Sequence, residues 1–384
     1  MHEISLTFCF VSGYLPQFSS QRFGIFPQEA DRFGIGLFDM RLEEFDYPLP
    51  EELIAQEPAA VRDLSRMMVV DRQTERIDIR TFRDLPEYIG PGDTIVVNDS
   101  RVFPARLIGR KETGGLIEIL LLVRRHEKLP EVEWEVLLRP AKRVAVGMTI
   151  AFADACRATV VSRLTEKQWL LRFTSAMPFD EFLARQGRAP LPPYIKRKRD
   201  RSRSEHDLER YQTVYARVQG SVAAPTAGLH FTPEVLDRLR CRGAAVAPVT
   251  LHIGYGTFLP IETEHVETHV MEEEHFILGE ETARKVNDST RVIAIGTTAT
   301  RVLESVAGEE GRIGPAARST RLYIYPGYRF RRVDALVTNF HLPKSSLFLL
   351  VCAFAGRELM QKAYRLAVEN RFRFYSYGDC MLIL

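Results

Sequence analysis

Residues 222–231 read VAAPTAGLHF, residues 245–252 read AVAPVTLH and residues 291–301 read RVIAIGTTATR. Each stretch starts as a short apolar run and ends in a turn rich in glycine or hydroxyl side chains. The predicted strands are Val222–Pro225, Ala245–His252 and Arg291–Ile295, and the predicted helices are Thr232–Arg242, Glu280–Asn287 and one that starts at Thr298. Strands that alternate with helices are typical of α/β proteins. We therefore predict an α/β main domain with a mixed sheet.

Shorter β-rich runs precede this region. They are Met67–Asp71, Arg76–Phe82, Thr94–Asn98, Ala105–Arg110, Leu116–Arg125, Glu133–Leu138, Met148–Phe152, Ala158–Ser162 and Gln168–Phe173. Their close spacing and the turn residues between them favour a small antiparallel β-barrel after Phe103. We predict that the barrel domain, 103–178, is inserted into an α/β catalytic domain formed by 40–102 and 179–384.

The first 39 residues have no sustained period of 2 or 3.6 and several glycine and proline breaks. Met40 resembles a start residue, because organised sequence begins there. We expect residues 1–39 to be an N-terminal extension that is disordered or an over-extended start. The apolar run Ile4–Leu15 has neither a basic region before it nor a small-residue cleavage site after it, so export is not expected.

Composition indicates a soluble, folded protein. The 384 residues include 52 Lys and Arg against 50 Asp and Glu, a net charge of +2, which excludes a uniformly basic RNA binder. Five cysteines are scattered without a CxxC pair, which favours a reducing compartment. No apolar run approaches the roughly 20 residues of a membrane helix. We expect a cytoplasmic protein without a membrane partner.

Several common motifs are absent. Gly254–Leu259 carries the first two glycines of a dinucleotide fingerprint and lacks the third, and there is no Walker A sequence. The order His265-Val266-Glu267 matches half of a nucleobase deaminase motif, but the P-C-x-x-C half is missing. The sequence therefore argues against a dinucleotide site and against phosphoryl transfer from nucleoside triphosphates, and it excludes a deaminase.

Four polar turns suggest a small-molecule site. The turns are Ala223–Phe231, Thr250–Phe258, Gly296–Arg301 and Thr338–Ser346. In open α/β sheets ligands bind beyond the carboxyl ends of the strands, where such turns converge. The substrate-binding candidates are Thr226, Gly228, Gly254, Gly256, Thr257, Thr297, Thr298, Arg301, Asn339, Lys344, Ser345 and Ser346.

Charge is segregated in two segments. Residues 196–203 hold six Lys or Arg, and Glu262–Glu281 holds eight Glu without Lys or Arg. The basic run is either a solvated loop or a phosphate-contacting arm. The acidic segment is either a solvated face or an acid/base site. His265 and His269 could share one helical face and bind zinc with Glu267, although the order differs from HExxH, and the alternative is a charged surface stretch.

Motifs in a fixed order strongly resemble one family. They are Asn98–Val102, Pro104–Leu107, Leu191–Ile195, Arg210–Tyr215, Ala223–Phe231, Gly296–Glu304, Thr338–Ser346 and Ser376–Asp379. The family is the S-adenosylmethionine:tRNA ribosyltransferase-isomerases of queuosine biosynthesis, the QueA family. The resemblance runs from Met40 to Asp379, nearly the whole chain, and does not cover residues 1–39.

The resemblance implies transfer and isomerisation of the ribosyl group of S-adenosylmethionine onto 7-aminomethyl-7-deazaguanine at a tRNA wobble position, giving epoxyqueuosine-tRNA, adenine and methionine. It implies a base near C5′ and a donor that helps adenine leave, with no metal. The catalytic candidates are His230, His252, His269, Glu274 and His341, with acid and base unassigned. The RNA-binding candidates are Arg101, Arg106, Lys196, Arg197, Lys198 and Arg199. A monomer is expected, with tRNA and S-adenosylmethionine as its partners.

This chain departs from the family pattern at Glu272, which stands where family members usually have a histidine, and in the more basic run from Lys196 to Ser204. That run is a candidate contact with the anticodon arm. Two other functions stay open at this point: a non-catalytic RNA-binding protein that uses the barrel and the basic run, and a metal-dependent hydrolase built on His265, Glu267 and His269.

Overall fold

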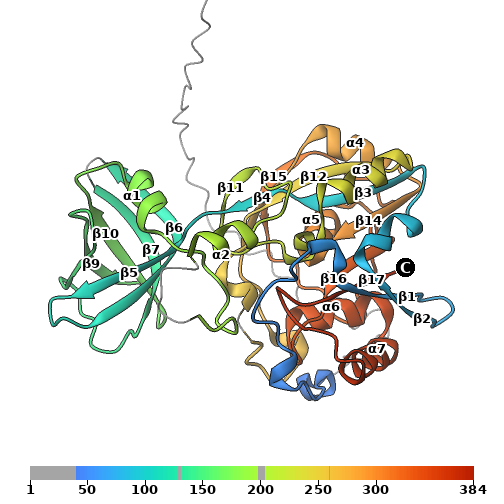
Figure 1. The fold of residues 1–384 in the computed structure, drawn as a ribbon, viewed down its shortest axis with the longest axis horizontal. Helices are drawn as coiled ribbons and strands as arrows, with labels where there is room; N and C mark the ends of the chain where they lie inside the picture. Colours follow the sequence, from blue (N-terminus) through green and yellow to red (C-terminus); the bar gives the residue numbers. More distant parts are fainter. Residues whose placement is uncertain (1–39, 129–130, 198–203, 259) are drawn as a thin grey trace, which may run out of the picture. The chain divides into compact units, whose positions relative to one another are not determined.

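The computed structural model describes residues 40–128, 131–197, 204–258 and 260–384. Met40–Leu384 belongs to one compact unit, which contains a large mixed sheet and a closed antiparallel barrel (Figure 1). The predicted fold class is therefore confirmed. The extension predicted for residues 1–39 lies outside the described residues, and the boundaries predicted at 102/103 and 178/179 stay predictions.

The large sheet has nine strands in the order β15-β13-β12-β3-β14-β16-β17-β1-β2. Their bounds are β1 Arg66–Val70, β2 Ile77–Thr81, β3 Asp93–Asn98, β12 Ala245–Leu251, β13 Glu274–Leu278, β14 Arg291–Ile295, β15 Ala316–Thr320, β16 Ala335–Asn339 and β17 Cys380–Ile383. The four central strands, β12, β3, β14 and β16, run parallel. Their carboxyl ends therefore lie at one edge of the sheet, where the predicted polar turns begin.

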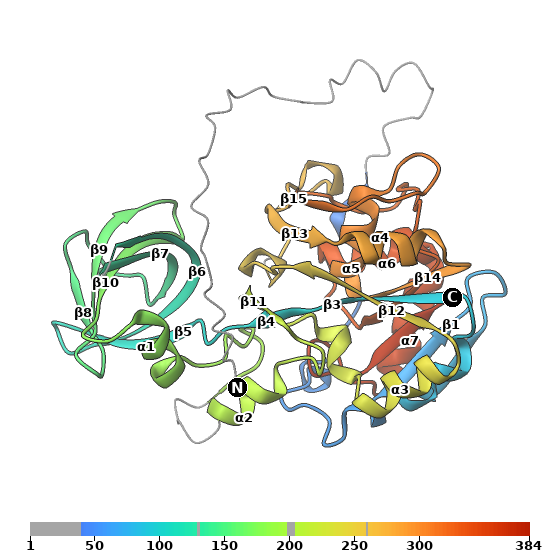
Figure 2. The ribbon, with the colours of Figure 1, turned by 90° about the horizontal axis from the view of Figure 1, so that it is seen from above.

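Both faces of these central strands are buried. In β3 the side chain of Val96 packs into one core, and those of Ile95 and Val97 pack into another. Helices α4 Glu280–Asn287, α5 Gly296–Val306, α6 Ser346–Ala355 and α7 Arg357–Glu369 contribute to the first core, and α3 Pro233–Cys241 contributes to the second. Figure 2 shows α3 and α4 on opposite sides of β3. Continuous apolar runs such as Val292–Ile295 form strands here because helices cover both sides.

The barrel closes through β10-β7-β6-β5-β8-β9. Its strands are β5 Arg106–Lys111, β6 Leu116–Lys128, β7 Glu131–Arg139, β8 Thr149–Ala151, β9 Arg157–Arg163 and β10 Gln168–Thr174, and α1 Phe179–Gln186 follows them. Along β7 the side chains of Val132, Trp134, Val136 and Leu138 are buried and alternate with more exposed ones. This period of two fills the barrel interior with apolar side chains, as the sequence pattern predicted.

Two predicted elements differ from the structure. The strand predicted at Val222–Pro225 is wrong: the strand β11 is Val218–Ser221, and it pairs with β4 Ser100–Val102 outside the large sheet. Pro225 has no N–H to donate to a ladder, and a 3-10 helix, η6 Thr226–His230, follows it directly. Helix α5 starts at Gly296, two residues before the predicted Thr298, and Gly296 has a φ of 87°.

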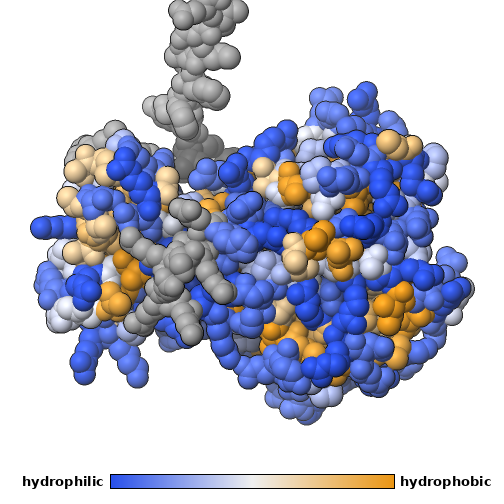
Figure 3. Space-filling model, in the orientation of Figure 1, coloured by the Kyte–Doolittle hydropathy of each residue, from blue (hydrophilic) through white to orange (hydrophobic). Residues whose placement is uncertain are grey.

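Among the described residues, none of the helices is both long and apolar enough to span a bilayer. On the face drawn in Figure 3 the surface is mainly hydrophilic, and apolar residues gather there only in separate small patches. That face therefore carries no broad apolar area of the kind that marks a large protein or membrane contact.

Candidate active site

A cavity of about 250 Å³ lies where the polar turns meet. It is lined by Tyr194, Ala223–Ala227, Ile253, Pro260, Gly296–Thr298, Thr338–Ser345, Leu347, Tyr375 and Ser376. Six predicted substrate-binding residues and one catalytic candidate, His341, are among them; the six are Thr226, Thr297, Thr298, Asn339, Lys344 and Ser345. The segment that leads into η6 and the turns after β14 and β16 thus line one cavity.

Asn339, the last residue of β16, is the most informative side chain in the cavity wall. Its Nδ2 donates to His230 Nε2 at 3.1 Å and lies 3.3 Å and 3.4 Å from the carbonyl oxygens of Tyr375 and Asp379. Three acceptors around Nδ2 fix the orientation of the amide. The Oδ1 atom is buried and has no hydrogen-bond partner among the described residues. A buried acceptor without a partner is costly, so Oδ1 is suited to receive an N–H from a ligand.

His230 lies behind Asn339 and does not line the cavity itself. Because Asn339 Nδ2 can only donate, His230 Nε2 accepts, and the imidazole carries its proton on Nδ1 when it is neutral. Burial, followed by the positive charges of Arg373 and Arg62, lowers the pKa of His230 to about 3. His230 is therefore neutral near pH 7 and holds Asn339 in place.

His341 lines the cavity and is also neutral near pH 7, because burial lowers its pKa to about 3. Its Nε2 lies 2.8 Å from Thr338 Oγ1, and its backbone N–H donates to the hydroxyl of Tyr364 at 3.1 Å. Thr338 thus holds the ring, and Tyr364 holds the backbone of the same residue. His341 therefore presents a neutral imidazole to the cavity.

These two pKa shifts predict acid sensitivity. Each folded-state pKa lies below the unfolded value of about 6.5, so the unfolded chain binds the extra protons and stability falls as the pH drops from about 6.5 towards 3. Each histidine should add a slope of up to about 1.4 kcal/mol per pH unit to the free energy of unfolding. In urea unfolding of His230→Gln between pH 4 and 6, the free energy of unfolding should depend less steeply on pH than in wild type. The difference should be up to about 1.4 kcal/mol per pH unit.

Exposed His206 provides the matched control. The control variant is His206→Gln, which makes the same substitution at the surface. An unchanged slope in His230→Gln would contradict the assignment of a buried neutral imidazole.

Two residues of the cavity wall have left-handed backbone, which non-glycine residues rarely adopt. Lys344 has a φ of 56° and Tyr375 a φ of 70°. The Tyr375 ring stacks on Tyr194 with 4.1 Å between centroids, and Lys344 Nζ pairs with Asp46 at 2.8 Å. Such backbone strain concentrates at functional sites.

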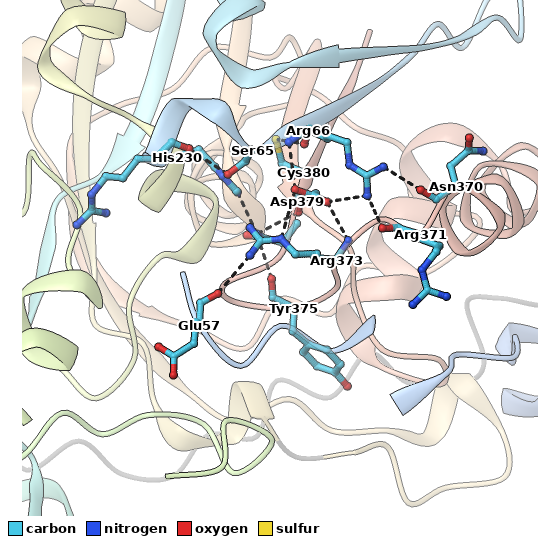
Figure 4. Close-up of polar contacts among 12 residues, drawn as sticks. Glu57, Ser65, Arg66, His230, Asn370, Arg371, Arg373, Tyr375, Asp379 and Cys380 are labelled. Carbon is cyan, nitrogen blue, oxygen red and sulfur yellow. Dashed lines mark hydrogen bonds and ion pairs between the residues drawn. The ribbon is translucent and has the colours of Figure 1, made fainter. Parts of the chain in front are cut away.

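The loop that carries Tyr375 is held by a carboxylate. Asp379 accepts the backbone N–H groups of Arg66 at 3.0 Å and Arg373 at 2.8 Å, and both guanidinium groups lie beside it (Figure 4). Asp379 is buried. These contacts join β1 to the loop before β17 and keep the Tyr375 carbonyl in reach of Asn339.

A second polar cluster lies around the turn after β12. Glu274 and Arg301 form an ion pair in which both side chains are only 5% exposed. Glu274 Oε1 also accepts the backbone N–H of Gly254 at 3.1 Å, and Arg301 Nε donates to the Leu322 carbonyl at 2.9 Å. Glu274 is therefore committed to structural partners, and the pair joins β13, α5 and this turn.

The remaining site candidates lie outside the cavity wall. His252 packs over Gly220, where a Cβ would come within 2.7 Å of the ring, and burial lowers the pKa of His252. His269 contacts the edge of Tyr323 at 5.2 Å, and burial lowers its pKa as well. The other candidates outside the wall are Gly228 beside Tyr215, Gly256 beside Glu272, and Ser346, the first residue of α6. The side chain of Thr257 lies outside the described residues.

The described part of the basic run is largely neutralised. Lys196 pairs with Glu51, and Arg197 makes two 2.9 Å bonds to the Asp207 carboxylate with its side chain 15% exposed. Lys198 and Arg199 lie outside the described residues. Of the other RNA-binding candidates, Arg106 donates to the Leu191 carbonyl and lies 3.6 Å from Glu118, and Arg101 is exposed on β4.

The helical zinc motif is not formed. His265 and His269 flank a single 3-10 turn, Val266–Thr268, so the prediction that they share a helical face is wrong. In the described parts of the chain, no group of three or more His, Cys, Asp or Glu is placed to hold a metal.

Residue-by-residue reasoning missed three parts of the cavity wall. Tyr194, Tyr375 and Ser376 line the cavity and lie outside the four turns that the sequence predicted for the site. Tyr194 and Ser376 belong to motifs quoted for the family resemblance, which was the available signal. Their hydroxyl oxygens lie 2.6 Å apart.

Comparisons with known proteins agree on one family. Residues 42–383 match the family described as "Queuosine biosynthesis protein". The chain is 55% identical over 361 residues to the S-adenosylmethionine:tRNA ribosyltransferase-isomerase of Syntrophus aciditrophicus, covering 90% of this chain and 100% of that protein. It is 51% identical over 348 residues to the enzyme of that name from Geobacter metallireducens, with the same coverage. The crystal structure of S-adenosylmethionine tRNA ribosyltransferase from Thermotoga maritima is similar, with 37% identity, a TM-score of 0.50, and coverage of 89% and 100%.

Proposed function

The chain belongs to the queuosine biosynthesis protein family, and on that premise we propose that it is the tRNA-modifying enzyme that transfers and isomerises the ribosyl group of S-adenosylmethionine. The acceptor is the amine of 7-aminomethyl-7-deazaguanine at the tRNA wobble position. The products are epoxyqueuosine-tRNA, adenine and methionine. The observation that supports a reaction in the 250 Å³ cavity is the unpartnered Asn339 Oδ1 in its wall.

The cavity suits the adenosyl part of the substrate. Its volume of about 250 Å³ lies just below the usual range of about 300–1,000 Å³ for small-molecule pockets, and its wall is mostly apolar with a few hydroxyl and amide groups. Asn339 Oδ1 would accept an N–H from the bound heterocycle, and the exocyclic amine of adenine is such a donor. The hydroxyls of Thr297 and Ser345 provide further polar contacts.

The lining favours the proposed chemistry electrostatically. The described residues of the cavity wall include no aspartate or glutamate, and Lys344 is already paired with Asp46. The sulfonium charge would then stay uncompensated and keep its full acidifying effect on the C5′ proton. A low-polarity wall also lowers the pKa of a buried amine, which keeps the attacking amine neutral.

The two buried histidines act as hydrogen-bonding groups in this proposal. With a pKa of about 3, each is on the order of 10³-fold weaker as a base than free imidazole. General bases work best when their pKa is near the operating pH. His341 therefore positions substrate as a neutral imidazole, and His230 acts through Asn339 as a positioning residue.

The partners follow from the reaction. We expect tRNA and S-adenosylmethionine as substrates, no metal, a monomeric state and a cytoplasmic location. The alternative of a non-catalytic RNA-binding protein is not favoured, because the curated relatives that match nearly the whole chain are named as enzymes. The alternative of a metal-dependent hydrolase is not favoured either, because His265 and His269 do not share a helical face.

The test is adenine release. Purified protein with S-adenosylmethionine should release adenine when tRNA carries 7-aminomethyl-7-deazaguanine, and the nucleoside mass should show the added ribosyl group. The same tRNA with unmodified guanine is the control and should release none. Failure of the modified tRNA to support release would overturn the proposed function.

A further inference from the structure

A small arginine-lined hollow lies behind the wall of the main cavity. Its volume is about 20 Å³, and Arg62, Arg210, His230, Ser376 and Tyr377 are part of its lining. A space needs about 10–15 Å³ to hold one water-sized group, so this hollow has room for an anion oxygen and excludes a nucleoside.

The hydrogen-bond partners of the two arginines are backbone carbonyls. Arg62 Nη1 donates to the Leu229 carbonyl at 3.0 Å, and Arg210 donates to the carbonyls of Ala59 and Ala60. Arg62 Nη2 also donates to the carbonyls of Glu209 at 3.4 Å and Arg210 at 3.5 Å, and among the described residues neither guanidinium forms an ion pair with a carboxylate. Two half-buried guanidinium groups with only carbonyl partners attract an anion.

Two polar groups at this position lack partners. Arg210 Nε and the Tyr377 hydroxyl are buried without a hydrogen bond to any described residue. Tyr377 is only 3% exposed, and its ring packs edge-on against Tyr211 at 5.9 Å. Both Nε–H and O–H can donate to the same anion, so the unpartnered atoms point to a ligand and not merely to surface charge.

The hollow and the main cavity are neighbours. Ser376 lines both, and His230 in the hollow bonds to Asn339 in the cavity wall. We propose that Arg62, Arg210 and Tyr377 bind a backbone phosphate of tRNA, next to the nucleotide whose aminomethyl group reaches the adenosyl group in the cavity. This inference rests on the proposed function, and it assigns the substrate phosphate to residues outside the basic run.

Salt dependence of tRNA binding tests the proposal. Each phosphate contact contributes about 0.7 to 0.9 to the slope of log K against log salt. Arg210→Gln should lower the magnitude of that slope by about one contact and weaken binding about tenfold at 150 mM salt. Arg210→Lys should keep the slope, because it keeps the charge. Exposed Arg284 on α4, on the other face of the sheet, supplies the control Arg284→Gln, which should match wild type.

A second variant guards against a folding defect. Tyr377→Phe removes only the hydroxyl and should raise KM for tRNA several-fold with kcat and melting temperature unchanged. The free nucleoside of 7-aminomethyl-7-deazaguanine, which has no phosphate, should bind wild type and Arg210→Gln equally. The proposed phosphate site is wrong if inorganic phosphate inhibits wild type and Arg210→Gln equally. It is also wrong if Arg210→Gln keeps the wild-type salt slope. Failure of the proposed function is distinct, because wild type would then release no adenine.

Discussion

Replacing Asn339 with alanine should lower kcat/KM for S-adenosylmethionine by about 10²–10³-fold, equivalent to about 3–4 kcal/mol. The substitution removes the only part of the residue that is left for a ligand, Oδ1, and it also leaves His230 Nε2 without its donor. Steady-state adenine release with the modified tRNA measures the effect.

Asn370→Ala is the matched control for this change. Asn370 is the exposed C-cap of α7, and its amide donates only within that helix, to Leu366. It should keep wild-type activity. Activity of Asn339→Ala within twofold of wild type, with an unchanged melting temperature, would remove Asn339 from the site.

Breaking the ion pair between Glu274 and Arg301 should destabilise the fold by about 3–5 kcal/mol, because it leaves one buried charge without a partner. Arg301→Met and Glu274→Gln are the single variants, and urea unfolding measures the free energy. The double variant Glu274→Leu with Arg301→Met should recover much of the loss, because it removes both buried charges.

An exposed pair offers the comparison. Asp237 and Arg240 on α3 are 69% and 58% exposed, so Arg240→Met should change stability by less than about 1 kcal/mol. A loss of similar size in Arg301→Met would refute the view that this pair is a structural joint. Under that result Glu274 would return to the candidates for acid/base catalysis.

Local patterns predicted most strands of the fold. The run Arg291–Ile295 is a strand at the predicted residues, because a continuous apolar segment between polar turns is stable only where both faces are covered. The apolar segment Val222–Pro225 misled the prediction, because its proline and its place beside a 3-10 helix exclude ladder bonds. Apolar composition alone does not distinguish these cases.

The candidate site was predicted as a set of turns, and its individual roles depend on contacts distant in sequence. Asn339 lies 109 residues from His230, and no local pattern shows which of them faces the ligand. Likewise Arg197 forms ion pairs with Asp207 and Glu57. Fewer positive charges of the basic run are therefore free to bind RNA than the sequence suggests. Contacts between distant parts of the chain therefore determine both which residue faces the ligand and how many charges are free to bind RNA.

A crystal structure of the protein with bound S-adenosylmethionine tests the central claim most directly. We predict that the adenosyl group occupies the cavity beside Tyr194 and Tyr375, with one of its N–H groups within about 3.2 Å of Asn339 Oδ1. Density for S-adenosylmethionine at another place on the chain, with the cavity free of it, would contradict this account.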